Sequence, residues 1–203
     1  MKVSVSQAIF LLKQGAVVAV PTETVYGLAA SFQNESAIEK IFTLKKRPRE
    51  NPLIVHIANF EQLNFLVKKI PTRFEKLKSF WPGPLTVVFD AETQLIPAIV
   101  RAGLETVAIR MPDHKQTLEV ISQTGPLVAS SANFSRQSPA ICAKQVEMNF
   151  GEKFTVLDGG SCKRGTASTI IRLKEESWEC LREGAFSLAE LERILGKKSF
   201  ASL

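Results

Sequence analysis

Hydrophobic residues along the chain follow two alternating patterns, helical spacing and short unbroken runs. Apolar side chains that recur every three or four residues indicate helices, whereas brief apolar runs indicate buried strands. A first helix is predicted to begin at Ser6 and to end at Gly15. The same spacing predicts helices at 36–46, 60–69, 72–80, 113–123, 141–149 and 188–195. The apolar runs predict strands at 16–20, 53–57, 85–89, 106–111, 127–130, 154–158, 168–173 and 178–183.

This interleaving of helices and strands predicts an α/β fold, with a mixed sheet covered by helices. The chain has 203 residues, which at roughly 100–200 residues per domain is the length of one domain. With 45% hydrophobic and 23% charged residues, the composition is that of a globular protein and argues against disorder and collagen-like repeats. We therefore expect a single domain over residues 1–203, with a core at about 5–196 and a frayed tail at 197–203.

Positive charge is concentrated in one part of the chain. Lysine and arginine number 26 against 20 acidic residues, a net charge of +6, and residues 40–78 alone hold ten basic and three acidic side chains. Such a local excess indicates an anionic partner, for example a nucleotide, a phosphate or RNA. The alternative is that these residues form the solvated face of two surface helices.

Cysteine and histidine are too few for the common disulfide and metal frameworks. Cys142, Cys162 and Cys180 form no CxxC pair, and reduced thiols in a cytoplasmic protein are the simplest explanation. With only His56 and His114 present, no structural metal is expected, and His114 is assigned a surface or helix-capping role. No apolar run approaches the ~18 residues of a membrane span, and no secretory signal is evident, so we expect a cytoplasmic protein without membrane contact.

Three polar segments lie next to predicted strands, where α/β sheets build binding sites. Residues 21–30 gather hydroxyl groups around Glu23, and residues 44–57 place cations before the strand that carries His56. Residues 128–140 offer hydroxyls, amides and backbone N–H groups suited to phosphate oxygens. A structural turn is the alternative for each segment. The glycine-rich residues 159–165 are also interpreted as a turn, and the common phosphate-binding motifs are absent.

One arginine stands inside an apolar strand pattern. Arg110 lies in VAIRM (107–111), and an arginine in such a strand needs an anionic partner or an exposed face. Together with Arg47 and Arg182, it is a candidate contact for an anionic ligand. From the residues alone, the prediction is a site for a phosphorylated or carboxylated small molecule.

In this order, the segments resemble the YrdC/TsaC family, the short-form threonylcarbamoyl-adenylate synthases. The resemblance runs from about Val17 to Gly184 and rests on PTETVYGL (21–28), KKRPRENPLIVHI (45–57), FWPGPLT (80–86), VAIRMPDH (107–114), SSANFS (130–135), the DGG to ST stretch (158–169) and LREGAFS (181–187). It implies an open, twisted mixed sheet flanked by helices, with a basic concave face. It also implies synthesis of threonylcarbamoyl-AMP and pyrophosphate from L-threonine, bicarbonate and ATP, for modification of tRNA beside the anticodon.

The resemblance assigns roles to the matching residues. The implied catalytic set is Lys45, Arg47, Ser131 and Asn133. The implied ATP contacts are Arg47, Asn51, Thr106, Ser131, Ser138 and Arg182, and the implied threonine contacts are Thr24, His56, Arg110 and Ser168. Mg²⁺ is expected with ATP, and tRNA and other threonylcarbamoylation proteins are further implied partners. Because a planar guanidinium suits a carboxylate bidentately, Arg110 is assigned the carboxylate of threonine.

Two positions depart from the family pattern. Arg136 stands where the family usually has glycine, and Ala140 stands where it has threonine. Two other functions stay open: a non-catalytic RNA-binding module of the same fold, and an ATP-dependent carbamoyl or adenylyl transferase with another acceptor. The Lys45/Arg47 and Ser131/Asn133 pairs favour the synthase, because a pure RNA binder would not need them. The sequence also lacks an aromatic RNA-stacking motif.

Overall fold

The computed structural model describes residues 1–135 and 137–197. Arg136 lies outside the described residues, and so does the predicted tail from residue 198 onward. Within the described part, no helix is long and apolar enough to cross a membrane.

A single mixed sheet of ten strands runs through the described residues, in the order β1-β8-β2-β3-β7-β4-β6-β5-β9-β10. The strands are β1 (Lys2–Val3), β2 (Val18–Val20), β3 (Gly27–Ser31), β4 (Ile54–His56), β5 (Leu85–Asp90), β6 (Thr106–Arg110), β7 (Leu127–Ser131), β8 (Val156–Leu157), β9 (Thr169–Leu173) and β10 (Trp178–Arg182). Parallel pairs, such as β4 with β6, occur beside antiparallel pairs, such as β3 with β7. The predicted α/β fold with a mixed sheet is confirmed.

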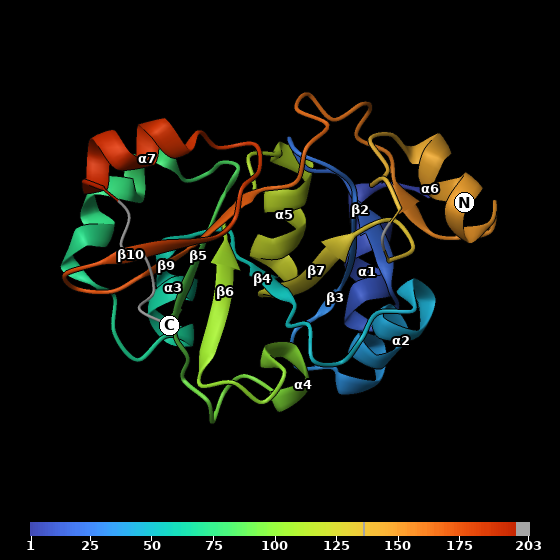
Figure 1. The fold of residues 1–203 in the computed structure, drawn as a ribbon. Coiled ribbons are helices and arrows are strands. Elements are labelled where there is room, and N and C mark those ends of the chain that lie inside the picture. Colours follow the sequence, from blue (N-terminus) through green and yellow to red (C-terminus); the bar gives the residue numbers. More distant parts are fainter. Residues whose placement is uncertain (136, 198–203) are drawn as a thin grey trace.

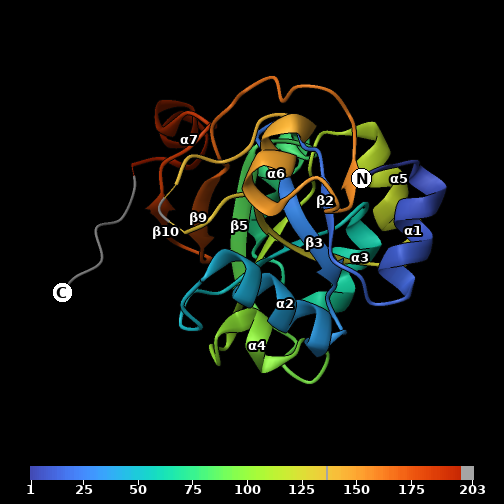
Figure 2. The same cartoon turned by 90° about the vertical axis from the view of Figure 1, so that its right-hand side faces the viewer.

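Helices cover both faces of this sheet (Figure 1). They are α1 (Val5–Lys13), α2 (Glu35–Lys45), α3 (Phe60–Leu66), the 3-10 helix η1 (Thr72–Phe80), α4 (Ala98–Arg101), α5 (Lys115–Thr124), α6 (Ala143–Phe150) and α7 (Leu188–Leu195). Figure 2 shows α1 and α5 side by side on one flank, where they pack on alternate residues of β2, β3 and β7. The intervening residues of these strands face α2 and the larger core cluster on the other side. This two-residue alternation is what a pleated strand imposes.

Two helix ends show how local sequence sets the boundaries. Helix α1 begins two residues earlier than predicted, because Ser4 and not Ser6 is its N-cap. The Ser4 hydroxyl accepts the backbone N–H of Gln7, and the Gln7 side chain accepts the N–H of Ser4, which is a reciprocal capping box. The predicted cap of α7 is confirmed, since the Ser187 hydroxyl accepts the backbone N–H of Glu190.

Strand β3 lies between the predicted strand at 16–20 and the predicted helix at 36–46, where no strand was predicted. Its sequence, GLAAS, consists mostly of small residues of low strand propensity. Hydrogen bonds to β2 on one side and β7 on the other hold it in the sheet. The short elements β1 and α4 were also missed, and residues 72–80 form a 3-10 helix and not the α-helix expected. Because β2 and β3 pair directly, residues 21–26 form a short connection at the end of both strands.

Candidate active site

A cavity opens over the central strands and gathers six of the residues singled out from the sequence. Arg47, His56, Arg110, Ser131, Ser168 and Arg182 all line its wall. They come from segments far apart in the chain: the turn after α2, strands β4, β6, β7 and β10, and the residue before β9. The parallel register of β4 and β6 sets His56 directly beside Arg110. The sheet therefore brings together side chains that the sequence only suggested were related.

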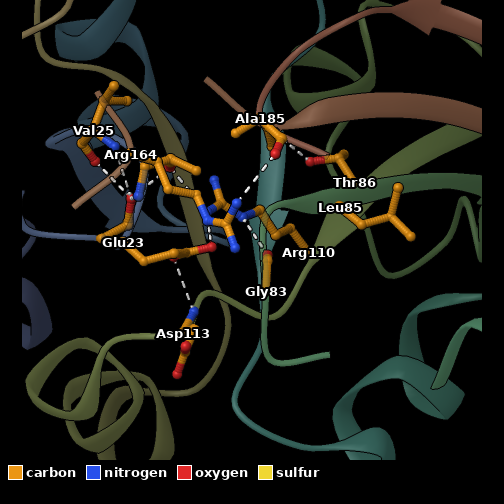
Figure 3. Close-up of polar contacts among 12 residues, drawn as sticks. Glu23, Val25, Gly83, Leu85, Thr86, Arg110, Asp113, Arg164 and Ala185 are labelled. Atoms are coloured by element: carbon orange, nitrogen blue, oxygen red, sulfur yellow. Dashed lines mark hydrogen bonds and ion pairs between the residues drawn. The ribbon is translucent and has the colours of Figure 1, made fainter. Parts of the chain in front are cut away.

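Arg110 is the most constrained cation of the cavity (Figure 3). Only 4% of the residue is exposed. Its Nε donates to Gly83 O at 3.0 Å, and Nη2 donates to Glu23 Oε1 at 2.7 Å and to Thr24 Oγ1 at 2.9 Å. The other carboxylate oxygen of Glu23 accepts the backbone N–H of Asp113 at 3.0 Å. Within the described residues Nη1 has no acceptor, so this nitrogen is left for a ligand in the cavity.

Arg47 and Arg182 are fixed by carbonyl oxygens instead of carboxylates. Arg47 donates to Asn51 O at 3.2 Å and to Pro52 O at 2.9 Å, and Arg182 donates to Ser168 O at 2.7 Å. Burial lowers the pKa of both guanidinium groups, and the charges of Arg110 and Arg47 lower that of Arg182 further. Neither takes part in an ion pair with a described residue. The cavity therefore has an excess of positive charge that an anionic ligand would neutralise.

Lys45 does not reach the cavity wall. Its amine is buried, with 1% of the residue exposed, and donates to Ser131 O, to Asn133 O at 2.8 Å and to Asn133 Oδ1 at 3.4 Å. Its own carbonyl accepts the N–H of Ser135 at 3.0 Å. Burial, with a smaller effect of the Arg47 charge, lowers the pKa of Lys45 to about 7. Lys45 thus orders the loop that presents Ser131, and its assignment to the catalytic set stays a prediction.

Four further residues assigned to ATP or to the catalytic set also lie off the cavity wall. Asn133 is buried within its own loop, where Nδ2 donates to Phe134 O at 2.9 Å and to Gln137 O at 2.6 Å. Asn51 and Ser138 are exposed, and Thr106 lies at the start of β6, opposite Asp90 and at the other end of the strand from Arg110. The assignment of Asn51, Ser138 and Thr106 to ATP stays a prediction, as does that of Asn133 to the catalytic set.

Of the two hydroxyl residues assigned to threonine, Ser168 lines the cavity and Thr24 lies behind its wall. Ser168 reaches the wall, and its Oγ lies 2.7 Å from Thr86 Oγ1, a buried hydroxyl that sequence reasoning missed. Thr24 is fully buried behind the wall, where Oγ1 contacts Arg110 and the Thr22 hydroxyl. Glu23 was noted only as a neighbour of the hydroxyls. Its partner Arg110 lies so far along the chain that no local pattern could have paired them.

Tyr26 ties the glycine-rich residues 159–165 to the site. Its hydroxyl donates to Gly160 O at 2.8 Å and accepts the N–H of Gly159 at 3.1 Å. The capping role assigned to His114 is not observed: the residue stands at the N-cap of α5, but its side chain makes no capping bond and packs against Gly159. A Cβ at Gly159 would come within 2.6 Å of Pro21 Cγ and 2.7 Å of the imidazole, so any other residue here would force one of these side chains to move.

Comparison with known proteins identifies the family. The family model Sua5/YciO/YrdC, described as "Telomere recombination", matches residues 10–184. The chain belongs to this family. The residues that line the cavity lie between Thr22 and Arg182, so all of them fall within the region that matches the Sua5/YciO/YrdC model.

Individual relatives agree with this membership. The chain is 44% identical to the threonylcarbamoyl-AMP synthase of Pyrococcus abyssi over 92% of its own length and 55% of the relative's. It is 40% identical to the enzyme of that name from Bacillus subtilis, over 95% of this chain and 56% of that one. A solved structure of P. abyssi Sua5 complexed with L-threonine superimposes with a TM-score of 0.90 and 43% identity, covering 95% of this chain and 57% of that one. The chain spans about half the length of these Sua5/YciO/YrdC relatives.

His56 gives this family member a buried, neutral imidazole in the cavity wall. The residue is 6% exposed, and burial together with the charge of Arg110 lowers its pKa to about 3. At neutral pH His56 therefore adds a polar surface without adding charge. The same shift makes folding sensitive to acid, because the unfolded chain binds a proton at this imidazole near pH 6.5 while the folded chain does not.

We expect the free energy of unfolding to fall by about 2 kcal/mol between pH 7 and pH 5 through His56 alone. The sign follows from proton binding: below pH 6.5 the unfolded state gains a proton that folded His56 takes up only near pH 3. Urea unfolding at the two pH values measures the effect. A His56→Gln variant should lose most of this pH dependence, whereas half-buried His114→Gln should keep it. An equal loss in wild type and His56→Gln would contradict the assignment.

Proposed function

We propose that this chain is a threonylcarbamoyl-AMP synthase, which forms threonylcarbamoyl-AMP and pyrophosphate from L-threonine, bicarbonate and ATP. The observation that carries the proposal is the cavity in which three arginines converge, of which only Arg110 has a carboxylate partner within the described residues. All three substrates, and both threonylcarbamoyl-AMP and pyrophosphate, are anionic or carry a carboxylate. The names of the Pyrococcus and Bacillus relatives and the threonine complex of P. abyssi Sua5 support the same reaction.

The chemistry needs positioning and charge compensation more than a reactive side chain. Bicarbonate takes up a proton and loses water to give CO₂, and the amine of L-threonine then adds to CO₂ and releases a proton, which gives a carbamate. A carbamate oxygen then forms a bond to the α-phosphorus of ATP, and the bond from that phosphorus to the bridging oxygen breaks, so pyrophosphate leaves. Fixed donors that hold these anions together offset their mutual repulsion and stabilise charge at the transferring phosphorus.

In this proposal each arginine has a separate partner. The free Nη1 of Arg110 binds the carboxylate of threonine, while Arg47 and Arg182 bind phosphate oxygens of ATP. Ser131 and Ser168 supply hydroxyl donors on the cavity wall. Lys45 acts one layer back, by holding the Ser131–Ser135 loop.

Mg²⁺ would accompany ATP as part of the substrate. Protein sites for Mg²⁺ usually offer one or two carboxylates beside substrate phosphates. The cavity wall formed by the described residues offers hydroxyl and carbonyl oxygens but no carboxylate, and both oxygens of nearby Glu23 already accept hydrogen bonds. Such neutral oxygen ligands are compatible with a Mg²⁺ ion that enters the cavity already bound to the triphosphate of ATP. The ion would neutralise phosphate charge, and the protein would hold the phosphates through Arg47 and Arg182.

Pyrophosphate release from purified protein tests the proposal directly. With ATP and bicarbonate, L-threonine should support release and form a labelled threonylcarbamoyl adduct. The kcat/KM for L-serine should be lower than that for L-threonine by a factor that corresponds to about 1–3 kcal/mol of activation free energy. This is the usual contribution of one methyl group bound in a pocket. Equal turnover of threonine, serine and alanine would exclude threonine as the specific acceptor. No pyrophosphate with any amino acid would favour the RNA-binding alternative. We further propose that the product serves tRNA modification, with tRNA and other threonylcarbamoylation proteins as later partners.

A further inference from the structure

Residues 158–168 connect β8 to β9 and form the orange segment at the top of Figure 1. This connection is fixed to the cavity wall at several points. Tyr26 binds Gly159 and Gly160, and the backbone N–H groups of Arg164 and Gly165 each donate at 3.0 Å, to Glu23 O and Thr24 O. The connection is therefore held on the same residues that hold Arg110.

Arg164 directs its guanidinium across the site and not toward an acidic partner. Its Nη1 donates to Ala185 O at 3.3 Å, a long hydrogen bond that uses one of five N–H donors (Figure 3). The ion pairs of the described residues do not include Arg164. Both arginines contact Glu23, Arg164 through its backbone N–H and Arg110 through Nη2, and Figure 3 draws their side chains next to each other. In agreement with this placement, the positive charge of Arg164 lowers the pKa of Arg110.

The charges at this end of the cavity do not balance. Arg110 and Arg164 contribute two positive charges, and Glu23 contributes one negative charge, whose two oxygens are already bound by Arg110 and by the Asp113 N–H. One positive charge is left over, together with free N–H donors on both arginines. A small carboxylate placed between them would balance the charge and satisfy these donors.

We propose that Arg164 is a specificity-determining residue that binds, together with Arg110, the carboxylate of the amino-acid substrate. The proposal rests on the proposed function, because it assigns a further contact within the same site. It makes a free α-carboxylate a requirement for binding. Lys163 and Arg164 are both exposed and cationic, but only the Arg164 side chain forms a hydrogen bond with another described residue. Lys163 therefore serves as a control for a general effect of positive charge.

Calorimetric titration with L-threonine and with L-threoninol, which has a hydroxymethyl group in place of the carboxylate, tests the proposal. The proteins are wild type, Arg164→Gln, Arg164→Lys and the matched control Lys163→Gln. We expect Arg164→Gln to weaken L-threonine binding roughly 5- to 20-fold. Arg164→Lys should restore part of this loss, and Lys163→Gln should bind as wild type does. Threoninol should bind weakly and with the same affinity to all four proteins, and ATP affinity should not change.

Three results would overturn the proposal. Unchanged threonine affinity in Arg164→Gln would show that the side chain makes no contact with the substrate. Equal weakening of threonine and threoninol would show that Arg164 only orders residues 158–168. Failure of wild type to bind L-threonine would overturn the proposed function as well, and this outcome is distinct from the other two. Thermal unfolding of each variant confirms that the comparison is between folded proteins.

Discussion

Arg110→Ala is expected to lower the free energy of unfolding by about 3–5 kcal/mol, because it removes one partner of a buried ion pair. Glu23 is 7% exposed, so its carboxylate would remain buried without its cationic partner. Thr24 Oγ1 and Gly83 O would lose a donor in the same substitution. Urea unfolding at pH 7 measures the change. In the folded fraction, the KM for L-threonine should rise roughly tenfold to a hundredfold, with a much smaller effect on ATP.

Two further variants separate the buried charge from lost packing. Adding Glu23→Gln to Arg110→Ala should recover part of the lost stability, because the orphaned carboxylate is then neutral. Arg49→Ala is the matched control, since Arg49 forms its ion pair with Glu39 on the surface, where such pairs contribute little. If Arg110→Ala proves no more destabilising than Arg49→Ala, the Arg110–Glu23 pair has no special role in stability. If ATP affinity alone falls, Arg110 is a nucleotide residue.

Arg47→Ala is expected to raise the ATP requirement for pyrophosphate release roughly tenfold to a hundredfold, since it removes a charged donor from the cavity wall. Most other cations of the 40–78 stretch are engaged elsewhere. Lys69 pairs with Glu175, Lys78 pairs with Glu75, and both lysines are on the surface. A Lys69→Ala/Lys76→Ala double variant and Arg49→Ala should therefore leave the ATP requirement close to that of wild type.

The outcome of this comparison decides how the positive stretch works. Arg49 stands two residues after Arg47 in the same turn, so it controls for local charge and for local folding. Equal losses in all three proteins would mean that residues 40–78 act as a diffuse positive field. That result would favour the RNA-binding alternative over a specific phosphate site. Lys45 is not used in the comparison, because its removal would release the Ser131–Ser135 loop as well as a charge.

Elements with a strong local signal were predicted well from the sequence. The apolar run at 53–57 became β4, and the periodic residues 188–195 became α7 with the expected Ser187 cap. Strand β3 was missed because its small residues have no strand preference of their own. It exists because β2 and β7 supply hydrogen bonds on both sides. A segment whose conformation is imposed by its neighbours leaves no trace in its own periodicity.

The site shows the same division between local and distant causes. The sequence alone identified Arg110 as an arginine that needs a partner, because a cation in an apolar strand is costly to bury. It also supplied the order of motifs that marks the family. Only the tertiary structure decided that the partner is Glu23, that Lys45 holds a loop, and that Arg164 lies near Arg110. These contacts join segments separated by tens of residues, and their geometry is fixed by strand register and loop packing. Composition and periodicity report which side chains must find partners, whereas the folded sheet determines which partners they find.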